Sequence, residues 1–305
     1  MEILISGYSG FVGSHLTDAL KMHTLLGLDI SKNDTVESHF NWNNLHRVPN
    51  YDAVIHLAGK AHDTANTADP ESYFEVNLGL TQKIFDHFIQ SSAKIFIFFS
   101  SVKAVADSVD QNILEENAAP NPLTPYGQSK LAAENYILGK KLPSEKKVYI
   151  FRPAMIHGPG NKGNLNLLFG IVQKGIPYPL GAFPNERSFM SVDNLTFLIE
   201  KILRSNIPSG VYNVCDDEPL STLVVVELMY RSLGRKARIM NIHKSIIQRL
   251  ASVGDYVGIP FNTERLKKMT ESYVVSNKKI KAALAIKALP LNANDGMLKT
   301  ITSFI

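Results

Sequence analysis

The N-terminal stretch of this chain constrains its fold more than any other. The apolar run from Glu2 to Ser6 ends in three glycines spaced three residues apart, Gly7, Gly10 and Gly13. Apolar residues then recur at a helical period, so the stretch predicts a strand, a tight turn and a helix. Glycine lets the backbone of the turn approach a pyrophosphate closely, and the positive end of the helix favours that anion. The stretch therefore predicts a dinucleotide site.

A carboxylate in the expected place supports this interpretation. A second apolar run, Thr24 to Leu28, ends in Asp29, which lies 22 residues after Gly7. A dinucleotide fold places at this position the acidic side chain that binds the ribose hydroxyls. Because a carboxylate pairs with a 2′-hydroxyl and repels a 2′-phosphate, we expect NAD. Lys32, three residues further on, keeps NADP open as the less favoured cofactor.

The composition narrows the class of protein. With 305 residues, of which 45% are hydrophobic and 20% charged, the chain can bury one large core, or a main core with a smaller partner. A net charge of +4 is too slight and too dispersed to indicate a nucleic-acid partner. The single cysteine, Cys215, is expected to be a small buried side chain.

The start of the chain and its apolar runs bear on the membrane. Met1 leads almost directly into a strand, and the most apolar run, 95–99, is far shorter than a bilayer span. We therefore expect no signal peptide, no membrane insertion and a cytoplasmic location.

Further apolar runs predict the rest of a parallel sheet, with a short strand around 36–40 and longer ones at 51–57, 94–99, 148–153 and 210–214. Ala58 and Gly59 follow one of these strands, and their small size suits either a ligand or close packing against a helix. His56 and His62 have no carboxylate or cysteine cluster beside them, so no metal site is predicted.

Four polar side chains predict the chemistry. Ser100 and Ser101 follow the strand at 94–99, at the sheet edge where ligands collect, although two serines there can equally cap a helix. Tyr126 and Lys130 lie four residues apart at a predicted helix start, so they share one face. A nearby ammonium can lower the pKa of a phenol from about 10 by one to three units. The pair therefore predicts a tyrosine that acts as acid and base.

Together these residues resemble a known family. The order and spacing of Gly7, Gly10, Gly13, Asp29, Ser101, Tyr126 and Lys130 resemble those of the extended short-chain dehydrogenase/reductases, and among them the nucleotide-sugar epimerase/dehydratase family, which includes UDP-glucose 4-epimerase. The resemblance implies an α/β fold with a Rossmann-type doubly wound parallel sheet and a smaller mixed C-terminal substrate domain. Residues 1–157 with about 188–215 would form the NAD-binding domain, and about 158–187 with 216–305 the substrate domain.

The resemblance also implies roles for individual residues. Tyr126 would be the general acid/base, Lys130 would hold the ribose and tune the tyrosine, and Ser101 would hydrogen-bond the sugar oxygen. The implied cofactor contacts are Gly7, Gly10, Phe11, Val12, Gly13, Asp29, Asn41, Trp42, Leu57, Ala58, Gly59, Asn77, Ser100, Tyr126, Lys130, Pro153 and Met155. Asn41 and Trp42 stand where relatives carry an acidic residue for the adenine, so this contact departs from the family pattern.

The implied substrate contacts are Lys60, Ser101, Val102, Lys103, Asn164, Arg187 and Arg265. The guanidinium fork of Arg187 suits a diphosphate, and a surface salt bridge is the alternative. Asn164 can equally cap a turn, and Arg265 can equally be a solvated helix charge.

The implied substrate is a nucleotide diphosphate sugar, and the expected reaction is 4-epimerisation of a UDP-sugar through a 4-keto intermediate. Dehydratases of the family carry an Asp-Glu pair where this chain has Val102 and Lys103, so elimination of water is not expected. The same turn, and the segment 185–188, also resemble bacterial 4-ketoreductases of deoxysugar and surface-polysaccharide synthesis. A dinucleotide-sensing protein without catalysis is a third possibility, but it would have lost the catalytic residues.

The resemblance extends to assembly. The predicted helices at 71–90 and 125–140 resemble the pair that forms a four-helix interface in relatives. We therefore expect a homodimer.

Overall fold

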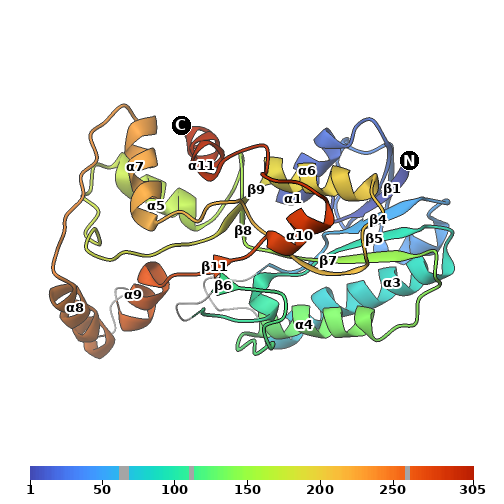
Figure 1. Ribbon diagram of the computed structural model, residues 1–305, viewed down its shortest axis with the longest axis horizontal. Helices are drawn as coiled ribbons and strands as arrows, with labels where there is room; N and C mark the ends of the chain where they lie inside the picture. Colours follow the sequence, from blue (N-terminus) through green and yellow to red (C-terminus); the bar gives the residue numbers. More distant parts are fainter. Residues whose placement is uncertain (62–68, 110–112, 258–261) are drawn as a thin grey trace.

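The computed structural model describes residues 1–61, 69–109, 113–257 and 262–305. Its centre is a seven-stranded sheet in the order β10-β7-β5-β4-β1-β2-β3, and each neighbouring pair runs parallel (Figure 1). The strands are β1 (Glu2–Ser6), β2 (Thr24–Leu28), β3 (Ser38–Phe40), β4 (Ala53–His56), β5 (Ile95–Phe99), β7 (Lys147–Pro153) and β10 (Gly210–Val214). The order reverses between β1 and β4, which creates a crevice for ligands at the carboxyl edge. The Rossmann-type sheet expected from the sequence is confirmed.

Helices cover both faces of this sheet, which explains why its strands are apolar without alternation. Helices α1 (Phe11–Ala19) and α6 (Val192–Leu203) lie on one face, and α3 (Leu80–Gln90) and α4 (Pro125–Leu138) lie on the other (Figure 1). Each face has its own core: one contains Leu16 and Leu198, and the other contains Phe85, Phe88 and Phe96, all fully buried. The buried layers hold the carboxyl edge in a fixed shape.

The helix predicted from Asp69 to Gln90 is present, with an irregular centre. It begins as α2 (Pro70–Tyr73), which Asp69 caps by accepting a hydrogen bond from the Glu71 N–H. A π-helical segment, Phe74–Gly79, then leads into α3. Wide turns of this kind often occur at functional sites, and this one carries Asn77.

A second, smaller core lies beside the carboxyl edge of the sheet. It includes Phe169, Val226 and Met297, which belong to α5 (Asn164–Gln173), α7 (Thr222–Ser232) and α11 (Ala293–Thr302). Helices α8 (Lys244–Val257) and α9 (Thr263–Thr270) extend from this part at one end of the molecule (Figure 1). Short strand pairs, β8 (Met155–His157) with β9 (Phe189–Ser191) and β6 (Ile113–Leu114) with β11 (Val274–Val275), join the two parts.

The C-terminal segment does not stay within the second part. Helix α10 (Lys278–Ala283) packs on β10, and Ile280 is fully buried in the core of the sheet. The predicted substrate domain, which includes 216–305, therefore contains a helix that packs on the central sheet. No helix in the described ranges combines the length and apolar character needed to cross a bilayer.

Candidate active site

The glycine turn has the shape that a dinucleotide requires. Gly7 has a φ of +73°, and a Cβ at this position would lie 2.6 Å from the backbone nitrogen of Ala58. A Cβ on Gly13 would overlap the backbone of Gly7 and Tyr8. Helix α1 begins after Gly10, so no side chain caps its first N–H groups. These donors, at the positive end of a helix, fit a pyrophosphate.

Asp29 lies beside this turn, at the end of β2. One carboxylate oxygen accepts hydrogen bonds from the backbone and hydroxyl of Ser9, at 3.0 and 2.7 Å, and the other accepts from the Ile30 N–H at 2.7 Å. The carboxylate is therefore fixed next to the glycines, in the place expected for a ribose contact. Lys32 is exposed to solvent.

The residues predicted for the adenine have structural roles here. Asn41 follows β3 and caps the short turn Trp42–Arg47 by accepting hydrogen bonds from the Asn43 and Asn44 N–H groups. The Trp42 ring packs edge-on against His56, with centroids 6.2 Å apart. The adenine contact of Asn41 and Trp42 stays a prediction.

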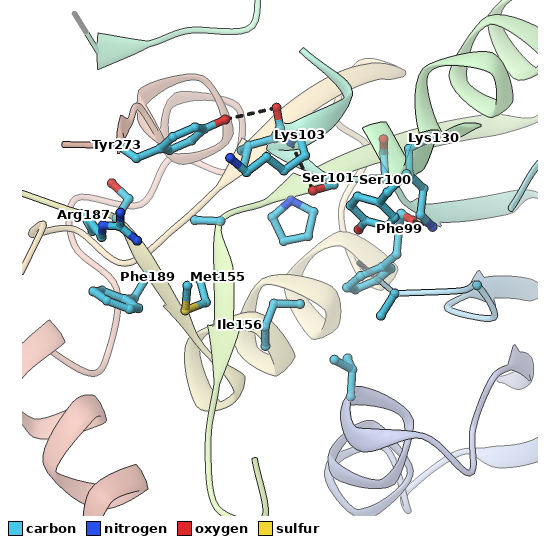
Figure 2. A pocket seen from close by; sticks show the side chains of 18 of the residues that line it. Phe99, Ser100, Ser101, Lys103, Lys130, Met155, Ile156, Arg187, Phe189 and Tyr273 are labelled. Atoms are coloured by element: carbon cyan, nitrogen blue, oxygen red, sulfur yellow. Dashed lines mark hydrogen bonds between the residues drawn. The ribbon is translucent and has the colours of Figure 1, made fainter. Parts of the chain in front are cut away.

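The proposed acid/base group lies where β5 and α4 meet. Strand β5 leads into Ser100 and Ser101, and Thr124 caps α4, which carries Tyr126 and Lys130. Figure 2 shows Lys130 close to these serines. The Lys130 ammonium donates a hydrogen bond to the Phe99 carbonyl at 2.8 Å, and the Tyr126 phenol is hydrogen-bonded to Ser101. The three predicted catalytic side chains therefore come together at the edge of the sheet.

Burial controls the ionisation of this group. It raises the pKa of Tyr126, and the hydrogen bond with Ser101 opposes that rise. Burial also lowers the pKa of Lys130 to about 8, while the charge of Glu134 opposes the fall. We expected Lys130 to lower the phenol's pKa. In the protein alone, burial raises the pKa of Tyr126 instead, and the opposing influence comes from the hydrogen bond with Ser101.

A buried ion pair lies behind Lys130 and was not predicted from the sequence. Glu134, one helical turn after Lys130, is fully buried and binds Arg152 on β7, with its oxygens 2.6 Å from Nη2 and 3.0 Å from Nε. The Ser100 hydroxyl donates to the same carboxylate. The pair therefore joins α4, β5 and β7 behind the catalytic side chains.

Asn77 holds the turn after β4. Its side-chain oxygen accepts from the Lys60 N–H at 2.8 Å, and its nitrogen donates to the Lys60 carbonyl and to the Ser129 hydroxyl at 3.1 and 3.0 Å. A Cβ on Gly59 would lie 2.8 Å from the Asn77 oxygen and 3.0 Å from the Lys130 ammonium. Asn77 thus positions Lys60 from behind, and a direct cofactor contact stays a prediction.

A cavity of about 390 Å³ lies between the sheet edge and the second part of the chain. Figure 2 shows Tyr273, Lys103 and Arg187 toward one side and Ser101 and Lys130 toward the other. The lining residues that were predicted from the sequence are Val12, Leu57, Gly59, Lys60, Ser100, Ser101, Val102, Lys103, Tyr126, Lys130, Pro153, Met155 and Arg187. The cofactor-side and substrate-side predictions thus meet in one cavity.

Three cations from separate segments surround this cavity. The Lys60 ammonium donates to the Ser72 hydroxyl at 2.6 Å, and the Lys103 ammonium donates to the Asp107 carbonyl at 2.6 Å. Arg187 donates to the Glu271 carbonyl at 3.2 Å and to the carbonyl of Lys268. In the described part of the chain, none of the three forms an ion pair with a carboxylate. Their charges are available to an anionic ligand.

The comparisons with known proteins agree with this geometry. Residues 3–215 match the model of the NAD dependent epimerase/dehydratase family. The chain belongs to this family. It is 31% identical over 252 residues to the UDP-glucose 4-epimerase of Vibrio cholerae, with 77% of this chain and 76% of the relative covered.

Two further relatives of this epimerase/dehydratase chain act on other substrates. An N-acetyl-α-D-glucosaminyl-diphospho-ditrans,octacis-undecaprenol 4-epimerase of Escherichia coli O157:H7 is 27% identical over 298 residues, covering 92% of this chain and 84% of its own. A GDP-6-deoxy-D-mannose reductase of Pseudomonas aeruginosa is 26% identical over 246 residues, covering 75% and 79%. The family relationship thus includes epimerases and a reductase.

The fold is that of solved epimerases of the family. The UDP-glucose 4-epimerase of Thermus thermophilus, solved with NAD, superposes with a TM-score of 0.76 at 22% identity, covering 100% of this chain and 99% of its own. At this identity the likeness supports the fold alone.

Two predicted substrate residues of this family member lie away from the cavity. Asn164 is the first residue of α5 and is exposed. Arg265 is exposed on α9, because that helix buries the next residue, Leu266, against the second core. The structure does not bring Asn164 or Arg265 to the cavity.

The sequence also missed part of the cavity wall. Phe189, Glu271 and Tyr273 line it. Phe189 lies two residues after Arg187, which is the spacing of side chains on one face of a strand. Tyr273 enters through backbone pairing with Arg187, for which the sequence carries no signal.

The histidines and acids of the described ranges form no cluster that could hold a metal ion. His62 lies outside the described residues. His56 is fully buried between β4 and α3, and burial lowers its pKa to about 3.

Proposed function

We propose that this chain is an NAD-dependent 4-epimerase of a nucleotide diphosphate sugar, with a UDP-sugar as the first candidate. The observation that carries the proposal is the cavity itself. Ser101, Tyr126 and Lys130 stand at its sheet edge, and Lys60, Lys103 and Arg187 surround the rest. Lys60 lies on the same side as Tyr126, because its ammonium is 5.0 Å from the centroid of the Tyr73 ring, which packs against the Tyr126 ring. Arg187 comes from the opposite wall. Proton-transfer groups and cations in one cavity suit a sugar attached to a diphosphate.

The residues divide the chemistry between them. Tyr126 takes the proton from the C4 hydroxyl and later returns it, while Ser101 hydrogen-bonds the same oxygen and keeps it in reach. Lys130, fixed on the Phe99 carbonyl, places a positive charge near the phenol, which favours its ionised form. NAD, when bound, supplies the hydride acceptor and donor at C4. The hydride would leave C4 for the bound cofactor and return to the opposite face of the C4 carbonyl after the sugar has rotated in the cavity, which would invert C4.

The cofactor residues are proposed on the same footing. The backbone N–H groups after Gly10 would hold the pyrophosphate, and Asp29 would bind the adenosine ribose. Because Asp29 is already fixed by Ser9, its negative charge stays where a 2′-phosphate would have to lie. This supports NAD over NADP.

The three cations indicate a diphosphate in the substrate, but they do not identify the nucleotide base. A guanidinium fork and two ammonium groups can pair with phosphate oxygens of any nucleotide. The V. cholerae relative supports UDP-glucose as the first substrate to test. The substrate named for the E. coli relative is a sugar diphosphate attached to undecaprenol instead. A diphosphate is common to both substrates.

A 4-ketoreductase is the alternative, and the P. aeruginosa reductase relative supports it. Its residues for proton transfer would be the same, so the two functions differ in the fate of the cofactor. A dehydratase is not supported, because Val102 and Lys103 enter the cavity where an acid and a base would be required. A purely sensing protein would have no need for Ser101, Tyr126 and Lys130 in one cavity.

The test is a panel of nucleotide sugars incubated with the purified protein, with and without added NAD, followed by chromatographic separation of the C4 epimers. The proposal predicts interconversion of one epimer pair without net consumption of the cofactor. Failure to convert any member, with stoichiometric reduction of a 4-keto sugar when NADH is supplied in place of NAD, would establish the reductase.

A further inference from the structure

Helix α8 presents an apolar stripe to solvent, far from the catalytic side chains. Ile246, Leu250 and Val253 follow each other at spacings of four and three residues, so they share one face, and they are 52%, 53% and 57% exposed. Tyr256 continues the stripe one turn later and is 94% exposed. Stripes of this kind mark interaction surfaces more often than single exposed side chains do.

Helix α8 is packed against the protein on another face, so the stripe is not the face that joins it to the core. Ile247 and Ala251, which are 3% and 0% exposed, are packed against the second core on the neighbouring flank of the same helix. Helix α8 therefore has a wide apolar arc, of which the protein covers one side only.

The charges around the stripe identify its partner. Helices α8 and α9 pack against each other and carry five exposed cations, Lys244, Arg249, Arg265, Lys267 and Lys268, against two exposed acids, Asp255 and Glu264. These two helices therefore hold a net charge of +3, out of +4 for the whole chain. The charge is thus less dispersed than its total suggests. A partner must combine negative charge with an apolar layer beneath it.

We propose that α8 docks on the surface of an anionic phospholipid bilayer. A helix with apolar residues on one face and Lys and Arg beside them lies in the headgroup plane, and its binding depends on both buried apolar area and attraction to anionic lipid. Nucleic acid would match the cations but leave the apolar stripe unpaired. This inference goes beyond the proposed function and does not depend on it.

The docked surface lies next to the cavity. Helix α9 packs against α8, and the carbonyl of Lys268 on α9 accepts a hydrogen bond from Arg187 in the cavity wall. The eight residues of α9 span about 12 Å at 1.5 Å per residue. Docking would therefore hold the cavity close to the lipid headgroups, where a sugar diphosphate carried on a membrane lipid could reach it.

The experiment is flotation of the purified full chain with vesicles of phosphatidylglycerol and phosphatidylethanolamine, and with vesicles of phosphatidylcholine alone. We expect flotation with the anionic vesicles, loss at high salt, and little flotation with phosphatidylcholine. Leu250→Gln with Val253→Gln should weaken binding at least about tenfold, because each removes apolar area from the headgroup layer. Lys244→Glu with Arg249→Glu should weaken it by a similar factor.

A matched control is available outside α8 and α9. Met22 and Ile305 are 85% and 69% exposed, and Met22→Gln with Ile305→Gln removes equivalent apolar surface elsewhere. This variant should float like the wild type, and all three double variants should keep their turnover on a soluble substrate. The proposal fails if the wild type does not float with anionic vesicles, or if the α8 variants float like the control. It also fails if light scattering shows that the stripe joins two copies of the chain instead.

Discussion

The two walls of the cavity are built in different ways. On the sheet side, Ser101 follows β5 and Lys130 lies on α4, between two buried cores, and the Glu134–Arg152 pair joins α4 to β7 behind them. On the opposite side, Arg187 is held through its backbone by single bridges to Leu220 and Tyr273, and within the described ranges its guanidinium donates to carbonyls only.

This difference matches what each wall has to do. Proton and hydride transfer require reacting atoms in one geometry, which regular elements with a packed core provide. Substrate recognition varies among relatives, and loops supported by few contacts can change without disturbing the sheet. We therefore expect residues of the sheet wall to control kcat and residues of the opposite wall to control the affinity for substrate.

The largest expected effect is on the sheet wall. Tyr126→Phe should lower kcat by about 10²–10⁴-fold, because a general acid/base contributes this much, and NAD binding should stay nearly unchanged. Tyr136→Phe is the matched control, since it lies on the same helix and donates to Asp86 away from the cavity. Turnover and NAD titration measure both effects. Wild-type turnover of Tyr126→Phe would remove the proposed acid/base.

Lys130→Ala should impair both catalysis and cofactor binding, since the side chain supports the phenol and is expected to hold the ribose. We expect lower kcat together with weaker NAD binding, measured by the same two assays. Unchanged NAD affinity would limit Lys130 to the tyrosine.

The next effect lies on the substrate wall. Arg187→Ala should raise the KM for the sugar nucleotide by about 10–100-fold with little change in kcat, because a hydrogen bond to a charged group contributes about 1.5–3 kcal/mol. Arg265→Ala, which changes an exposed arginine outside the cavity, should leave both constants unchanged. Equal effects of the two substitutions would show that the cavity does not define the diphosphate site.

A smaller effect is expected in the glycine turn, where two substitutions distinguish backbone strain from steric crowding. Gly7 and Gly160 both have positive φ, at +73° and +79°, but only a Cβ on Gly7 meets other backbone atoms. Gly7→Ala should weaken NAD binding by about tenfold or more, and Gly160→Ala should not, although both incur the strain of about 1–2 kcal/mol for a left-handed residue. Calorimetric titration with NAD tests this, and equal losses would contradict the crowding explanation.

The Glu134–Arg152 pair should affect the pH dependence of kcat/KM. Lys130 must be protonated to favour the phenolate, so activity should fall as the pH rises through its pKa, which burial lowers to about 8. Glu134→Gln removes the negative charge that opposes this lowering, so the alkaline limb of kcat/KM should shift to lower pH.

The control for this profile is Asp86→Asn, which changes a carboxylate on α3 that binds Tyr136 and Lys140. It should leave the limb in place. A Glu134→Gln enzyme with an unshifted limb would mean that the pair supports the fold only.

The sequence predicted the sheet wall well, for a physical reason. Gly7, Asp29 and Ser101 each follow a strand within two residues, Lys130 lies in the first half of α4, and parallel strands bring their carboxyl ends to one edge. Local spacing therefore carried enough information to place these residues along that edge.

The rest depends on contacts between distant segments. The Glu134–Arg152 pair requires the register of α4 on β7, and Tyr273 reaches the cavity through pairing with Arg187, 86 residues earlier. Asn164 and Arg265 were predicted from loop and helix positions alone, where the sequence does not tell which side faces the cavity. No periodicity fixes such contacts.

The smallest and least direct expectation is the homodimer. It rests on helices α3 and α4, which lie together over one face of the sheet and carry the exposed Leu138. Light scattering at micromolar concentration should give the mass of two chains. A monomer would contradict this expectation.

The measurement that tests the central claim most directly follows the hydride. A nucleotide sugar carrying deuterium at C4 is incubated with the protein in the presence of unlabelled NADH, and the product is analysed by mass spectrometry. An epimerase keeps its cofactor through both half-reactions, so we predict that the C4 epimer retains the deuterium and that the nicotinamide absorbance does not change. In a parallel incubation, a 4-keto nucleotide sugar is supplied with NADH. Steady oxidation of NADH there, with no epimer formed from the labelled sugar, would contradict the account and establish the reductase.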